Sequence, residues 1–203
     1  KLERALAIEP GRVSTLRLLL AHAVRLKRWL QAALYLSQII EQEQTEEDLM
    51  TAFRVFEGLG DAAQALAAAE KLYGLGPQYT AVYASALLAA GRAEEAERVA
   101  DKGLSETSPA GRSSLLLVKA RVTRGKDPTK AVELLQQVLA SDPHDLQTLR
   151  EISSLYMELG EQRRARQYLR QAVELAPEDK ALAGELQRLE QALEQGQSSG
   201  SGG

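Results

Sequence analysis

The chain has 203 residues, of which 44% are hydrophobic, and 25 basic against 28 acidic side chains give it a net charge of −3. This balance disfavours a nucleic-acid partner, because a phosphate backbone is normally bound by a clearly basic face. The absence of cysteine excludes disulfides and thiolate metal sites, and no apolar run reaches the roughly 18 residues that a membrane-spanning helix needs.

Prolines recur at a nearly constant interval and indicate an internal repeat. Pro109, Pro143 and Pro177 are 34 residues apart, and Pro77 and Pro10 continue the series with Gln44 between them. Inside each interval a turn residue is followed by small or apolar residues 5, 9 and 12 places later; in the last interval these residues are Gly160, Ala165, Leu169 and Ala172. A fixed period of this length is typical of stacked helical repeats.

The repeat predicts the following elements in chain order. Residues 1–10 match the second helix of a truncated repeat, which indicates that further chain precedes it. Five repeats follow at 11–44, 45–77, 78–109 (with a shortened first helix), 110–143 and 144–177. An apolar stripe predicts a capping helix at 178–195, and 196–203 is a flexible Gly/Ser tail or linker by composition.

Each repeat is expected to form two amphipathic helices joined by a tight turn. Gly60, Gly91 and Gly160 can adopt the left-handed conformation that ends a helix, and Lys27 stands at their place in the first repeat. The alanine five places after each turn allows the second helix to approach the first closely. No stretch alternates with period two for long enough to indicate a strand.

The 34-residue helix–turn–helix period with its Gly, Ala, Ala and Pro skeleton resembles the tetratricopeptide repeat family over roughly residues 1–194. The resemblance implies an all-α, right-handed superhelical solenoid of antiparallel helical hairpins, and indicates a piece of a longer bacterial protein. Related solenoid families stay open for the third repeat. Leucines occupy the place of the family's tryptophan at Leu16, Leu49 and Leu149, and Trp29 is expected to serve packing.

In this family the first helix of each hairpin lines a concave groove that holds peptides or helices. Carried onto this sequence, the resemblance implies the candidate partner-binding residues Arg17, Ala21, Met50, Arg54, Glu57, Ala81, Ser85, Leu116, Ala120, Arg150, Ser154 and Met157. The three arginines are either solvated or locally paired, or they bind an acidic or C-terminal segment. The family's clamp for chaperone C-termini needs asparagine, which this chain lacks, so that ligand is disfavoured.

No pattern of catalytic or cofactor-binding residues is present. His22 and His144 are not in a metal-ligand spacing, and neither a nucleophile elbow nor a phosphate-binding loop occurs. We therefore expect no cofactor, no metal and no enzyme activity.

The sequence favours a protein-binding scaffold or adaptor. Its composition looks bacterial and resembles envelope adaptors of the protease-activating or exopolysaccharide-export type, so the periplasm, an outer-membrane-anchored location and the cytoplasm all stay open. The alternative is a module for self-association or for packing inside a larger protein. An acidic run at 41–48 and a basic run on the second helix of the fifth repeat are expected to face solvent, with docking on the convex side as the minority hypothesis.

Overall fold

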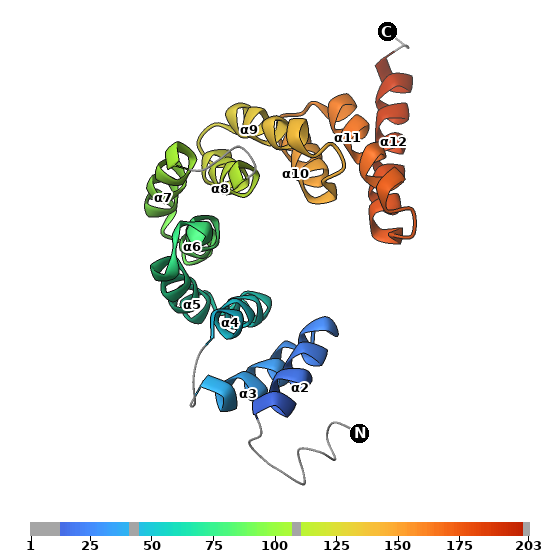
Figure 1. Cartoon of the computed structure of the whole chain (residues 1–203). Helices are drawn as coiled ribbons and strands as arrows, with labels where there is room; N and C mark the ends of the chain where they lie inside the picture. Colours follow the sequence, from blue (N-terminus) through green and yellow to red (C-terminus); the bar gives the residue numbers. More distant parts are fainter. Residues whose placement is uncertain (1–12, 41–44, 107–110, 201–203) are drawn as a thin grey trace. The chain divides into compact units, whose positions relative to one another are not determined.

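The computed structural model describes residues 13–40, 45–106 and 111–200, and all regular structure in these ranges is helical (Figure 1). This confirms the predicted all-α class. The chain divides into two compact units, Lys1–Val99 and Ala100–Gly203. The predicted half-repeat at 1–10 lies outside the described residues, as do 41–44 of the acidic run and 201–203 of the tail.

Unit 1 is built from consecutive antiparallel helices that pack against one another in chain order. Its helices are α2 (Val13–Arg25), α3 (Trp29–Ile40), α4 (Glu46–Leu59), α5 (Ala62–Leu75), a 3-10 turn (Pro77–Tyr79) and α6 (Thr80–Ala89). Helix α7 (Ala93–Glu106) crosses the boundary between the units. Helix α6 has 10 residues, because the turn that begins at Pro77 occupies the place of the first helical turn.

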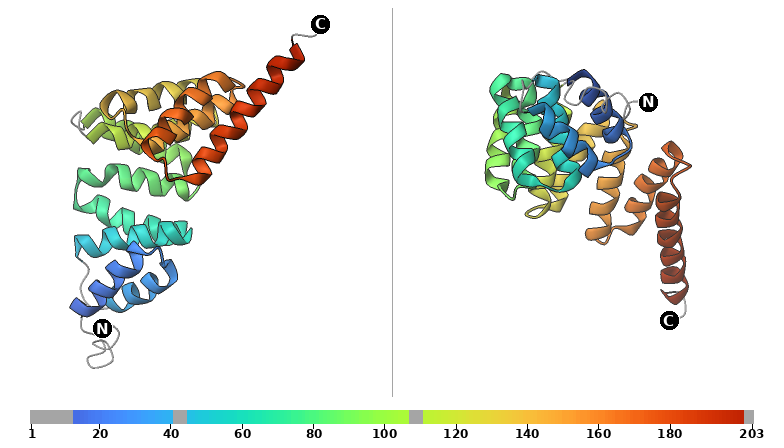
Figure 2. Two further views of the ribbon diagram at one scale, coloured as in Figure 1. Left: turned by 90° about the vertical axis from the view of Figure 1, so that its right-hand side faces the viewer. Right: turned by 90° about the horizontal axis from the view of Figure 1, so that it is seen from below.

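Unit 2 continues the same plan. Its helices are α8 (Arg112–Arg124), α9 (Pro128–Ser141), α10 (Leu146–Glu158), α11 (Gln162–Leu175) and α12 (Lys180–Gly200), and neighbours in this order pack together. Helix α12 ends at Gly200 and not at the predicted residue 195, and Figure 2 shows its C-terminal part extending past α11. Extending an existing helix by one residue costs little, whereas starting a new helix is unfavourable. The helix therefore continues into the Gly/Ser-rich residues although their composition does not favour a helix.

We call the pair α2–α3 hairpin 1, α4–α5 hairpin 2, α8–α9 hairpin 4 and α10–α11 hairpin 5. The left-handed turns predicted for hairpins 1, 2 and 5 and for the connection between α6 and α7 are present. Gly60, Gly91 and Gly160 have φ angles of 75°, 77° and 75°, and Lys27 takes the same left-handed region with a φ of 53°. In hairpin 4, Gly125 has a φ of −72°, and the backbone N–H groups of Lys126 and Asp127 both donate to the Thr123 carbonyl oxygen.

One buried alanine marks the close approach within each hairpin. These alanines are Ala32, Ala65, Ala131 and Ala165, and none is more than 2% exposed; Ala96 of α7, at the corresponding position, is also buried. A second close contact joins hairpin 1 to α4, where the indole ring of Trp29 lies against Gly58. A Cβ atom added at Gly58 would approach the ring to 2.5 Å, so Trp29 serves packing as predicted.

Candidate partner-binding groove

Helix α10 is amphipathic, and its exposed face carries three of the predicted partner-binding residues. The Asp145 side chain begins the helix by accepting hydrogen bonds from the backbone N–H groups of Gln147 and Thr148. The buried face consists of Thr148, Leu149, Ile152, Ser153, Leu155 and Tyr156. Arg150, Ser154 and Met157 are not buried and share the opposite face, because residues three and four places apart are neighbours on a helix.

This face of α10 lines a pocket of about 910 Å³, which we call the α10–α12 groove. The lining residues are Arg124 of α8; Leu146, Gln147, Arg150, Glu151, Ser153, Ser154 and Met157 of α10; Gln162 and Leu169 of α11; and Glu185, Arg188, Leu189 and Ala192 of α12. Leucine, methionine and alanine side chains supply the apolar part of the lining. A volume of this size accommodates a small ligand or several side chains of a peptide.

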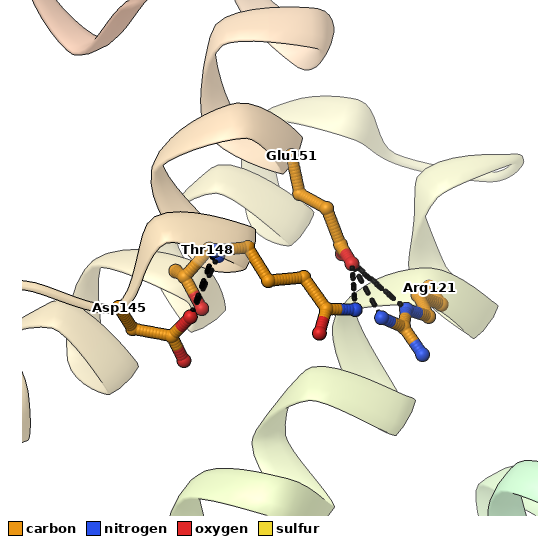
Figure 3. Close-up of polar contacts among 5 residues, drawn as sticks. Arg121, Asp145, Thr148 and Glu151 are labelled. Carbon is orange, nitrogen blue, oxygen red and sulfur yellow. Dashed lines mark hydrogen bonds and ion pairs between the residues drawn. The ribbon is translucent and has the colours of Figure 1, made fainter. Parts of the chain in front are cut away.

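Ion pairs between α8 and α10 fix one wall of the α10–α12 groove. Figure 3 shows Arg121 of α8 and Glu151 of α10 pointing toward each other, and the Arg121 Nε atom donates to the carboxylate at 3.1 Å. Gln147 donates to the same carboxylate, also at 3.1 Å. Because the Glu151 carboxylate accepts these hydrogen bonds, it holds α8 and α10 together and is not available to a ligand.

A second ion pair lies further along the same two helices. The Arg124 guanidinium donates to Ser154 Oγ at 2.9 Å and pairs with the Glu158 carboxylate. The hydrogen bond from Arg124 holds the pKa of Glu158 below its usual value. Arg124 and Glu158 are therefore charged at neutral pH and already paired with each other.

Three charged groups of the α10–α12 groove have few partners among the residues that the structure describes. Arg150 reaches Asp179, with 3.8 Å between the nearest nitrogen and oxygen. Arg188 donates to the Gly184 carbonyl oxygen of its own helix at 3.2 Å and forms no ion pair within the described ranges. Glu185 forms neither a hydrogen bond nor an ion pair with any described residue. Two guanidinium groups and one carboxylate are thus available to a ligand.

Arg17 has a different role from the one predicted by the anion-binding hypothesis. Its guanidinium donates to both carboxylate oxygens of Asp48, at 3.0 and 2.6 Å. The Asp48 side chain is 3% exposed and also accepts hydrogen bonds from the backbone N–H and the hydroxyl of Thr45. These bonds, with that from Arg17 the strongest, hold the pKa of Asp48 below its usual value against the effect of burial. Arg17 is locally paired and joins α2 to the start of α4.

The other predicted residues of unit 1 do not line the α10–α12 groove, which lies within unit 2. The exposed ones are Ala21, Arg54 and Glu57, and the half-buried ones are Met50, Ala81 and Ser85. Met50 packs against the core of unit 1. A role of the remaining five in binding stays a prediction.

Leu116 and Ala120 are core residues and are not accessible to a partner. They are 7% and 1% exposed and belong to the apolar core of unit 2. Helix α8 is buried on more than one side, and its buried residues are Leu115, Leu116, Val118, Ala120, Val122 and Thr123. A helix of this kind is covered by its neighbours on several sides. The face of α8 that the repeat register assigned to the groove is therefore covered by other residues and cannot contact a partner.

Sequence reasoning missed the contribution of α12. The predicted capping stripe includes Leu189, and Glu185, Arg188 and Ala192 flank it at helical spacing. A capping helix covers the last hairpin with its apolar face, and residues beside that face lie at the edge of the contact. This spacing could have indicated Glu185 and Arg188 as groove residues.

The described residues contain no cluster of three or more His, Asp or Glu side chains that could hold a metal ion. No helix in these ranges is both long and apolar enough to cross a bilayer.

Comparisons with known proteins agree with this architecture. The tetratricopeptide repeat family model matches residues 124–193, and no curated protein matches the chain. The crystal structure of TTC0263, a thermophilic TPR protein of Thermus thermophilus, is similar with 23% identity and a TM-score of 0.73, covering 86% of this chain and 96% of that one.

Two further solved structures are similar at lower identity. The TPR protein YrrB, described with an unusual peptide-binding site, has 12% identity and a TM-score of 0.52, with 92% of this chain and 97% of that one covered. The first TPR domain of Spaghetti, bound to an HSP90 peptide, has 18% identity and a TM-score of 0.51, with 58% and 92% covered. Residues 124–193 therefore match the model of the tetratricopeptide repeat family, and the chain has the tetratricopeptide fold.

Proposed function

We propose that this chain is a protein-binding scaffold and that it holds a short segment of a partner protein in the α10–α12 groove. Stacked helical repeats serve generally as surfaces for protein partners. The observation that carries the proposal is the groove itself, which combines an apolar lining with charged groups that have few partners among the described residues.

The groove favours a segment that has an apolar side chain beside a carboxylate. Leu146, Met157 and Leu189 offer an apolar surface for the first, and methionine adapts readily to different shapes. Arg150 and Arg188 are available for the second, because a guanidinium binds a carboxylate through paired hydrogen bonds. A positively charged side chain elsewhere in the segment could form an ion pair with Glu185.

Two of the similar structures support a peptide as the occupant. YrrB is described with a peptide-binding site, and the Spaghetti domain holds an HSP90 peptide. The assignment to a bacterial envelope adaptor stays a prediction, which identification of the partner will test. Self-association also stays a prediction, and sedimentation equilibrium over a range of concentrations will test it.

A displayed library of random peptides, selected on the immobilised chain, tests the groove. We expect the enriched sequences to pair an apolar residue with Asp or Glu. The variant Arg150→Glu/Met157→Ser/Arg188→Glu should bind these peptides at least about tenfold more weakly, because it loses two charge-assisted contacts. None of the three side chains is buried, so the variant should keep its helicity.

The matched control is Arg98→Glu/Arg163→Glu, which reverses two exposed arginines that neither line the groove nor belong to the predicted partner-binding residues. It should bind the selected peptides like the wild type. If both variants bind equally well, or if the enriched peptides lack carboxylates, the α10–α12 groove is not the binding site.

A further inference from the structure

Hairpin 1 exposes leucines where the other hairpins do not. Leu30 and Leu34 lie one turn apart on α3 and are 76% and 65% exposed. The corresponding positions lie two residues before and after the buried alanine, and none of them is buried in the other second helices. They hold Ala63 and Ala67 in α5, Glu94 and Arg98 in α7, Thr129 and Glu133 in α9, and Arg163 and Gln167 in α11. The two leucines are therefore not required by the fold.

The leucines of hairpin 1 are part of a wider concentration. Leu18 and Leu26 are also exposed, at 59% and 45%, so hairpin 1 holds four of the seven exposed large apolar side chains in the described residues. Leu26 lies in the turn, directly before Lys27 and Arg28, and Leu30 lies in the first turn of α3. An apolar concentration of this kind on one element commonly marks an interaction surface.

The same hairpin is basic and contains no carboxylate. Residues Val13–Ile40 include Arg17, Arg25, Lys27 and Arg28, and neither Asp nor Glu. Arg17 is paired with Asp48, whereas Arg25, Lys27 and Arg28 form no ion pair with any carboxylate among the described residues. Hairpin 4 also has an excess of cations, but it contains Asp127 and Glu133 and exposes no large apolar side chain in its described residues. The combination of both properties sets hairpin 1 apart.

We propose that hairpin 1 is a peripheral docking surface for an anionic lipid bilayer. Leu30 and Leu34, with Leu26, would enter the boundary between headgroups and acyl chains, and Arg25, Lys27 and Arg28 would lie among the phosphates. Leucines beside Lys and Arg are the combination that interfacial helices use, and each cation near an anionic membrane adds to the affinity. The chain would lie on the membrane without crossing it.

Other occupants fit the surface less well. A second copy placed hairpin to hairpin would bring like charges together with no carboxylate on either side.

Co-sedimentation with lipid vesicles tests the proposal. We expect the chain to bind vesicles made of equal parts phosphatidylglycerol and phosphatidylcholine, to bind pure phosphatidylcholine at least about tenfold more weakly, and to lose affinity at high salt. Equal binding to both kinds of vesicle, or to neither, would overturn the proposal.

Two variants remove the two parts of the surface separately. Leu30→Gln/Leu34→Gln removes the apolar part, and a polar pair is compatible with the fold because α11 has Arg163 and Gln167 there. Lys27→Gly/Arg28→Asp removes one positive charge and reverses another, and it copies the turn of hairpin 2, where Gly60 precedes the helix-capping Asp61. Each should weaken binding to the anionic vesicles about tenfold or more.

The control Leu75→Gln/Leu175→Gln replaces two exposed leucines at the ends of other helices, and it should bind like the wild type. Leu30→Gln/Leu34→Gln should melt at the wild-type temperature. A lower melting temperature would mean that the leucines pack against the chain itself, and a dimer lost in this variant would identify a second copy as the occupant. The groove variant should still bind vesicles, so the two proposals can fail independently.

Discussion

Hairpins 1 and 5 have the same turn geometry and the same kind of buried alanine between their helices, although their exposed residues differ. In hairpin 1 the backbone N–H groups of Lys27 and Arg28 donate to carbonyl oxygens of the last turn of α2, and those of Gly160 and Glu161 do the same for α10. Both second helices bury their marker alanine completely. The parts that decide how two helices of a hairpin fit together are therefore the same at both places.

The exposed positions of the two hairpins carry different chemistry. The first helix of hairpin 1 uses Arg17 to pair with buried Asp48, whereas hairpin 5 leaves Arg150 at 3.8 Å from Asp179. On the second helix, leucines in hairpin 1 correspond to polar side chains in hairpin 5. The repeat determines which positions are buried, and the positions that it leaves exposed are free to give each hairpin its own partner.

Changing the buried alanine that both hairpins have gives the largest predicted effect on stability. Ala32→Leu and Ala165→Leu should each lower the free energy of unfolding by roughly 3 kcal/mol, because three added carbon atoms at a fully buried position force the two helices apart. Urea denaturation followed by circular dichroism measures this loss. Ala63→Leu, at a position of α5 that is not buried, is the control and should change the stability little. A similar loss in the control would mean that the close helix approach is not the cause.

Replacing Arg17 and replacing Arg150, which occupy the same position in hairpins 1 and 5, should affect stability differently. Arg17→Met should lower the melting temperature clearly at neutral pH, because it leaves the Asp48 carboxylate buried without its cation. Arg150→Met, the matched change in hairpin 5, should have little effect because its ion pair is long and exposed. Equal losses in the two variants would contradict the assignment of Arg17 to the fold.

The pH dependence of Arg17→Met checks the cause. Arg17 lowers the pKa of Asp48 in the folded state, so the stability that this pair contributes is fully present above the ordinary carboxyl pKa of about 4. It is lost as the pH falls through the lowered pKa of the folded protein. The difference in melting temperature between wild type and Arg17→Met should therefore shrink below about pH 4.

Much of the fold could be predicted from the sequence because the same small set of residues recurs. The 34-residue period indicated the left-handed turns at Gly60, Gly91 and Gly160 and the equivalent place of Lys27, and all four have positive φ angles. The continuation of α12 to Gly200 was not predicted, because composition describes the preference of isolated residues and not the propagation of a helix that has already formed.

The candidate site was predicted less well. Arg150, Ser154 and Met157 were predicted because α10 repeats the register of the other first helices, and they line the α10–α12 groove, while their role in binding stays a prediction. Glu185 and Arg188 were missed because α12 has no counterpart in the repeat, so no register assigned its faces. Leu116 and Ala120 were misassigned because the register gives a position in the hairpin and not the neighbours that cover it. The apolar run from Leu115 to Val118 was the available signal that α8 is buried on several sides.

Exchanging the turn residues of hairpins 1 and 5 gives the smallest predicted effect and the sharpest test of their equivalence. The positive φ of Lys27 costs backbone strain, so Lys27→Gly should raise the free energy of unfolding by roughly 1 kcal/mol. Gly160→Lys should lower it by a similar amount, because a Cβ atom at Gly160 meets no atom within 4 Å and only the backbone conformation opposes it. Thermal denaturation of both variants measures these two changes in stability. If both variants change the stability in the same direction, the two turns are not equivalent. If hairpin 1 binds anionic vesicles, Lys27→Gly should also weaken that binding while it stabilises the fold, so that a change in one cannot be the consequence of the other.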